Sequence, residues 1–205
     1  GKRLIPLLFG TGLTFTIFGI FFNGILKDGV TLWVPTYVTQ FFGADASVAS
    51  LVTIILPIFN LVGVYLAVRL FKNVLKNEML TATIMFTISI FSLTLLFFFG
   101  RYSMLFAVIM LALTTASMLG VNTMFLTFIP LNFSNVGRAS SVTGFLDACS
   151  YLASAASGVT IGVITESYGW NTTVITWIAV AFLGALVSFL GINSWKKGRF
   201  MLTGR

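Results

Sequence analysis

Histidine is absent from the 205-residue sequence, and cysteine occurs once, at Cys149. The chain therefore lacks the side chain that most often ligates metals and relays protons near neutral pH. A single cysteine cannot form an internal disulfide, and no G-x-x-x-x-G-K-[ST], H-E-x-x-H or C-x-x-C motif occurs. Catalytic triads and zinc sites are excluded on these grounds. We expect no enzymatic activity, no metal and no cofactor.

Charge is scarce as well. Charged residues make up 8% of the chain and hydrophobic residues 58%, whereas soluble domains carry about 25% charged residues. The composition is that of a membrane protein, with the lipid bilayer as its partner. The net charge of +7 does not indicate nucleic-acid binding, because no basic, aromatic-bearing soluble module is present.

Six apolar segments are long enough to cross a bilayer, given about 20 residues for each crossing. They cover approximately residues 10–41, 46–71, 78–99, 102–130, 138–165 and 171–194. The sequence therefore predicts an all-α polytopic membrane protein, with residues 1–205 forming a single six-helix bundle. The first segment is too long for an upright crossing, so we expect a tilt or a bend near Gly24, Gly29 and Pro35.

The distribution of basic residues predicts the orientation. Ten of the 12 basic residues fall on one side of the predicted bundle, whereas Arg101 falls on the other side and Lys27 within the membrane. The ten are Lys2, Arg3, Arg69, Lys72, Lys76, Arg138, Lys196, Lys197, Arg199 and Arg205. We therefore expect a multi-pass protein of the plasma membrane with both termini in the cytoplasm. Because the chain begins with Gly-Lys-Arg, we interpret it as a fragment or half of a longer protein.

Three charged residues are predicted within the membrane: Lys27 and Asp28 in the first segment and Asp147 in the fifth. Glu78 is assigned to a connector on the basic side. Charges at bilayer depth are costly and mark substrate or ion pathways by default. Neighbouring helical residues diverge by about 100°, so we expect Lys27 and Asp28 to face apart and Lys27 to pair with Asp147 across two helices. A permanent, purely structural ion pair has about equal weight.

Polar side chains on the same predicted helix faces extend this hypothesis. Asn23 lies four residues before Lys27, and Tyr151 lies four after Asp147, so each pair shares a helix face. Asn122 interrupts the fourth segment. Convergence of Asn23, Lys27, Asn122, Asp147 and Tyr151 would form a binding site, although each polar residue alone more often bridges two helices.

The fifth segment is rich in small residues. Spacings such as Ser140–Gly144–Ala148 and Ser154–Gly158–Gly162 allow two helix backbones to approach closely. This composition favours an interior helix, either mobile or statically packed.

Three motifs resemble a known family. K-D-G-V-T-L-W-V-P-T-Y at residues 27–37 resembles the seventh helix of major facilitator superfamily transporters. Its pattern is most similar to that of the organophosphate:phosphate antiporters, which carry glycerol phosphate and hexose phosphates. G-R-A-S-S-V-T-G-F at residues 137–145 and Y-G-W-N at residues 168–171 agree with that resemblance, which covers essentially the whole chain.

The resemblance implies the C-terminal six-helix half of a major facilitator fold. Lys27 would occupy the position of the family's phosphate-binding arginine, and Trp33 of the same motif would be a further substrate-binding residue. Arg69 and Lys72 would belong to the gating loop between the second and third helices. Such a half supplies one wall of a midplane site and needs a second six-helix half, either a missing N-terminal portion or another copy.

Three functions are compatible with these observations. The first is secondary transport of a small organic or phosphorylated anion by alternating access, with Lys27 facing the anion. The second is proton-coupled transport of a neutral or cationic solute, with Asp147 or Asp28 as charge partner or proton carrier. The third is a six-helix membrane assembly subunit without transport activity.

Overall fold

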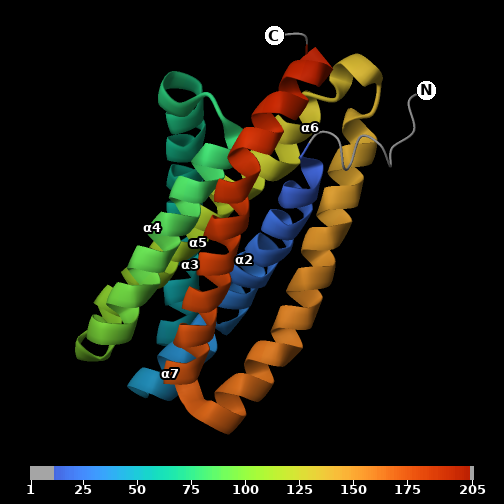
Figure 1. Cartoon of the computed structure of the whole chain (residues 1–205). Coiled ribbons are helices and arrows are strands. Elements are labelled where there is room, and N and C mark those ends of the chain that lie inside the picture. The colour runs from blue at the N-terminus through green and yellow to red at the C-terminus, as the bar shows by residue number, and fades with distance from the viewer. Residues whose placement is uncertain (1–11, 204–205) are drawn as a thin grey trace.

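The computed structural model describes residues 12–203, which are helical almost throughout and contain no strand. The elements follow the chain in the order α2 (Leu13–Phe42), α3 (Ala46–Leu70), η1 (Phe71–Leu75), α4 (Glu78–Phe99), η2 (Gly100–Tyr102), α5 (Met104–Thr123), η3 (Met124–Phe128), α6 (Ile129–Leu131), η4 (Ser134–Val136) and α7 (Ala139–Thr203). Short turns join the long helices, which form an elongated bundle (Figure 1).

Helix α7 consists of two limbs. Gly169 has φ 80° and ψ 174°, a non-helical conformation that divides the 65-residue element. A side chain at this φ would be strained, and glycine has no Cβ to prevent it. The limb before Gly169 and the limb after it run in opposite directions, and the sharp reversal between them lies at the lower end of the bundle (Figure 1).

Five helices of the described chain are long and apolar enough to cross a membrane, counting the two limbs of α7 as one element. The first three begin at Leu13, Ala46 and Glu78, close to the predicted starts. The predicted fourth segment contains α5, η3 and α6, and the predicted fifth and sixth correspond to the two limbs of α7. Helical structure and the capacity to span a membrane are therefore confirmed.

The surface of α3 agrees with a lipid environment. Large apolar side chains project outward at every third or fourth position, which places them on one face of the helix. They are Leu51, Ile54, Ile58, Leu61 and Tyr65, each more than half exposed. In water such a stripe would be unfavourable, whereas lipid tails solvate it.

The contact between α2 and α7 is unusually close because small residues meet there. A Cβ built on Gly24 would lie only 2.5 Å from the carbonyl oxygen of Ser150, and one built on Gly29 would lie 2.5 Å from Oγ of Ser157. Ser150, Ala153 and Ser157 lie on one face of the first α7 limb and are buried. These three small residues thus form a packing face, and Gly24 and Gly29 provide room for it.

Candidate functional site

Lys27 and Asp28 are the two central residues of the 30-residue helix α2. Nζ of Lys27 lies 2.8 Å from Oδ1 of Asp28, and the two side chains are 21% and 37% exposed. The prediction that these neighbours face apart was therefore wrong. No ion pair joins Lys27 to Asp147 within residues 12–203.

The physical reason is the length of the lysine stem. The 100° divergence applies to the Cα–Cβ bonds of adjacent residues, but four methylene groups allow the ammonium to turn back toward the neighbouring carboxylate. A lone charge in an apolar helix is costly. Pairing with the nearest opposite charge lowers that cost without requiring another helix.

Ser154 connects the pair to α7. Its hydroxyl hydrogen-bonds to Oδ2 of Asp28 and also lies 3.2 Å from the carbonyl oxygen of Gly24. Asp28 therefore interacts with a cation through one oxygen and with a hydroxyl donor through the other. The close packing at Gly24 places the α7 backbone near enough for a short serine side chain to reach the carboxylate.

Asn23 and Asn122 form a second polar contact one turn before the pair. Nδ2 of Asn23 donates to Oδ1 of Asn122 over 3.3 Å, which links α2 to α5. Asn23 is fully buried, and its Oδ1 has no hydrogen-bond partner among the described residues. An unsatisfied buried acceptor costs about 1–3 kcal/mol, so the helix contact at Asn23 is less favourable than a fully paired one.

Trp33 lies further along α2 in an aromatic cluster. Its ring centroid is 6.4 Å from that of Trp170 at an interplanar angle of 67°, and its edge covers Gly162 of α7. Within the described residues its buried Nε1 has no acceptor. Trp33 therefore contributes packing, together with one unused hydrogen-bond donor.

The structure does not bring Asp147 or Tyr151 into direct polar contact with Lys27. Both residues lie on the first limb of α7, where Asp147 is half-buried and Tyr151 is 65% exposed. Within residues 12–203 the polar contacts join Lys27 to Asp28, Asp28 to Ser154, and Asn23 to Asn122. Of the five residues predicted to converge, only Asn23 and Asn122 are joined by a hydrogen bond in the described chain, and Lys27 instead contacts Asp28, whose other partner is Ser154.

Arg69 and Lys72, predicted in a gating loop, lie at the end of α3 and in η1. Both are exposed. Arg69 donates to the hydroxyl of Tyr65 over 3.5 Å, and Nζ of Lys72 lies 5.9 Å from the ring centroid of Phe128. Their described contacts are therefore with aromatic side chains rather than with a carboxylate.

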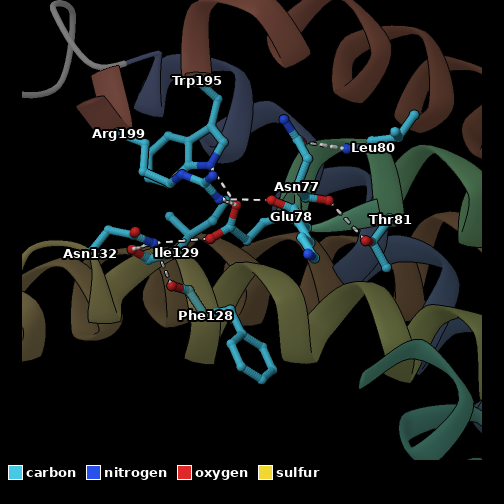
Figure 2. Close-up of polar contacts among 10 residues, drawn as sticks. Asn77, Glu78, Leu80, Thr81, Phe128, Ile129, Asn132, Trp195 and Arg199 are labelled. Atoms are coloured by element: carbon cyan, nitrogen blue, oxygen red, sulfur yellow. Dashed lines mark hydrogen bonds and ion pairs between the residues drawn. The ribbon is translucent and has the colours of Figure 1, made fainter. Parts of the chain in front are cut away.

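Glu78 was assigned to a connector, but it is the first residue of α4 and its side chain is only 3% exposed. Figure 2 shows three donors around its carboxylate. Oε2 accepts from Nε1 of Trp195 at 2.9 Å and from Arg199 at 3.1 Å, and Oε1 accepts from Asn132 at 3.1 Å. The Glu78 cluster, defined as these four residues, thus joins the start of α4 to the region after α6 and to the end of α7.

The sequence around Glu78 and around Trp195 contains local patterns from which part of this cluster could have been predicted. Asn77 precedes Glu78 and caps α4, accepting from the backbone N–H of Leu80 at 2.9 Å, and a carboxylate in the first turn is favoured by the helix dipole. Trp195 and Arg199 are four residues apart, hence on one helix face. Their meeting with Glu78, more than a hundred residues away, depends on tertiary packing that no local pattern specifies.

The described residues contain no group of three or more histidine, cysteine, aspartate or glutamate side chains placed to hold a metal ion. The chemistry available at the centre of α2 is therefore that of one ammonium, one carboxylate, one hydroxyl and two amides. No protein-family model matches the chain, and a search of curated proteins found no match.

Proposed function

We propose that this chain is one half of a secondary transporter that moves a small organic or phosphorylated anion across a membrane by alternating access. The observation that carries the proposal is the partly exposed Lys27–Asp28 pair at the centre of an apolar, membrane-length helix. A chain without a function for these charges would be more stable with apolar residues at both positions.

The pair has properties suited to an anion site. Asp28 neutralises Lys27 while no ligand is present, so no isolated cation remains at bilayer depth. An entering anion competes with Asp28 for the ammonium, and Ser154 continues to hold the displaced carboxylate through its hydroxyl. The partial exposure of both side chains gives a ligand access to the pair.

The neighbouring amides supply neutral hydrogen bonds. Asn23 lies four residues before Lys27 in α2 and bonds to Asn122. Its Oδ1 has no partner among the described residues and is buried, so it would accept a hydrogen bond from a hydroxyl of the solute only after α2 and α5 move apart during the transport cycle. An anion that also carries hydroxyl groups, such as a sugar phosphate, matches these groups better than a bare inorganic anion does.

The resemblance of residues 27–37 to the seventh helix of organophosphate:phosphate antiporters supports the same proposal. Under it, Lys27 provides a compact charge in place of a bidentate arginine, so selectivity among oxyanions should be broad. A second six-helix half would complete the site at the interface between the halves. The exposed charges of α2 would then face that interface.

The test is anion exchange by the full-length protein reconstituted in liposomes, measured as uptake of labelled glycerol phosphate against internal phosphate. Lys27→Ala should abolish exchange, and Lys27→Arg should retain it. The double variant Lys27→Met/Asp28→Asn removes both charges with little change in shape, so it should fold without exchanging anions.

The double variant separates function from structural pairing. If it exchanges anions at the original rate, the pair is structural and the proposal fails. A substrate-driven pH change that Asp147→Asn abolishes would favour proton coupling instead. No flux with any tested solute, in a protein that retains its thermal unfolding midpoint, would favour a non-transporting assembly subunit.

A further inference from the structure

A second feature of the fold lies at the opposite end of the bundle from the Glu78 cluster. The ends of α2 and α4, η2 and the start of the second α7 limb enclose a cavity of about 400 Å³. Its size is within the range typical of small-molecule sites. Its lining includes Tyr37, Phe41, Phe97, Trp170, Asn171 and Arg101.

The aromatic wall of this cavity is ordered by ring contacts. Tyr37 stacks on Phe41 with centroids 5.0 Å apart and an interplanar angle of 13°. Trp170 meets Tyr37 edge-on at 5.0 Å, and its Nε1 donates to Gln40 over 3.2 Å. Buried Tyr37 and Trp170 thus hold the partly exposed ring of Phe41 in place, and an aromatic ring fixed in this way suits stacking with a planar ligand.

The cation in the cavity is Arg101. Its side chain is exposed, donates to the hydroxyl of Tyr102 over 3.0 Å and lies 5.0 Å from the Tyr102 ring centroid. No carboxylate of the described chain forms an ion pair with it. No acidic residue lines the cavity in the described part of the chain. A guanidinium without a carboxylate partner can bind a carboxylate or phosphate group through two parallel hydrogen bonds.

We propose that this cavity binds an organic anion with a flat aromatic body, whose acidic group pairs with Arg101 and whose ring packs against the exposed part of Phe41. Asn171 offers a further amide donor at the same wall. The inference is independent of the transport proposal, because it involves neither Lys27 nor Asp28 and applies equally to a protein that transports nothing.

The experiment is calorimetric titration of the full chain in nanodiscs with 2-naphthoate, its neutral isostere 2-naphthalenemethanol, and acetate. Naphthoate should bind most tightly. Arg101→Gln should weaken naphthoate binding about tenfold, the effect of losing a charge-assisted hydrogen bond. Arg69→Gln is the matched control, because Arg69 is also exposed and also donates to a tyrosine hydroxyl, but lies outside the cavity.

The aromatic contribution is tested separately. Phe41→Leu should weaken binding about two- to tenfold through loss of ring stacking. Phe21→Leu should not, although Phe21 lies on the same helix and is 39% exposed against 37% for Phe41. Equal binding of the neutral isostere, or equal losses in the test and control variants, would overturn the proposal.

Discussion

Two acid–base pairs lie in the described part of the chain, one at the centre of α2 and one where α4 begins. In the first, Asp28 is 37% exposed and interacts with Lys27 and Ser154. In the second, the carboxylate of Glu78 is 3% exposed and receives hydrogen bonds from three side chains. The two pairs also differ in sequence separation. The Lys27–Asp28 pair joins adjacent residues, whereas Glu78 joins the start of α4 to Asn132 and to the end of α7.

This difference indicates different roles. A buried carboxylate with several donors is costly to disturb, because every donor loses its partner when the carboxylate leaves. Such a cluster fixes the relative positions of α4, α6 and α7. A partly exposed pair with fewer bonds can exchange one partner for a ligand at low cost. Stability should therefore depend mainly on Glu78, and ligand exchange on Lys27.

The largest loss of stability is expected for Glu78→Ala. The buried Nε1 of Trp195 would lose its acceptor and a small cavity would form, so we expect the free energy of unfolding to fall by about 2–4 kcal/mol. The thermal unfolding midpoint in detergent should fall by roughly 4–16 °C. The matched control is Glu166→Ala at an exposed position, which should change little. Equal thermal unfolding midpoints for the two variants would show that the Glu78 cluster does not stabilise the fold.

A smaller loss is expected at the helix contact that positions Ser154. Gly24→Ala would place a Cβ against the Ser150 carbonyl oxygen, and backbone cannot move aside as a flexible side chain can. We expect a loss of about 1–3 kcal/mol from the forced separation of α2 and α7. At Gly144 a Cβ would meet nothing within 4 Å, so Gly144→Ala should be neutral or stabilising by up to about 1 kcal/mol. The midpoints of the two variants should therefore shift in different directions or by clearly different amounts.

Much of the fold was predictable because each membrane helix is encoded by a long continuous run of apolar residues. The starts of α2, α3 and α4 follow from the lengths of apolar runs and from the polar connectors between them. Small residues from Ser150 to Gly162 lie at a close helix contact, whereas the predicted spacing Ser140–Gly144–Ala148 lies on an exposed face, so that part of the prediction was wrong. The reversal at Gly169 lies in the predicted connector between the fifth and sixth segments and separates two helical limbs that run in opposite directions.

The site was less predictable because it depends on side-chain reach and on tertiary position. Helix periodicity predicted that the side chains of Lys27 and Asp28 face apart. It does not describe the flexible lysine side chain, which folds back so that its ammonium reaches the Asp28 carboxylate. Periodicity placed Asn23 on the same face as Lys27 but did not determine that Asn122 would meet it. Local sequence placed Glu78 in a connector, since the side chains that bury it come from more than 50 residues away and no local pattern specifies them.

A double-mutant cycle on the central pair sharpens the comparison with Glu78. Lys27→Met alone leaves the Asp28 carboxylate with Ser154 and whatever water reaches it, so we expect a loss of about 1–2 kcal/mol, below that of Glu78→Ala. Adding Asp28→Asn should recover part of this loss, because it removes the unpaired charge. The thermal midpoints of the two single variants and the double variant provide the measurement. A single-variant loss exceeding that of Glu78→Ala would reverse the assignment of roles.

The smallest effect is expected for Ser154→Ala. The serine hydroxyl has one proton, and three acceptors lie within its reach: Oδ2 of Asp28 and the carbonyl oxygens of Gly24 and Ser150. Asp28 is the strongest of these acceptors because it is charged. The carbonyl oxygens keep their helical hydrogen bonds when the hydroxyl is removed, and partly exposed Asp28 keeps Lys27. We therefore expect a loss of about 0.5–1 kcal/mol, against no change for Ser140→Ala at an exposed position of the same limb. A loss as large as that of Gly24→Ala would show that Ser154, rather than close backbone packing, holds α2 against α7.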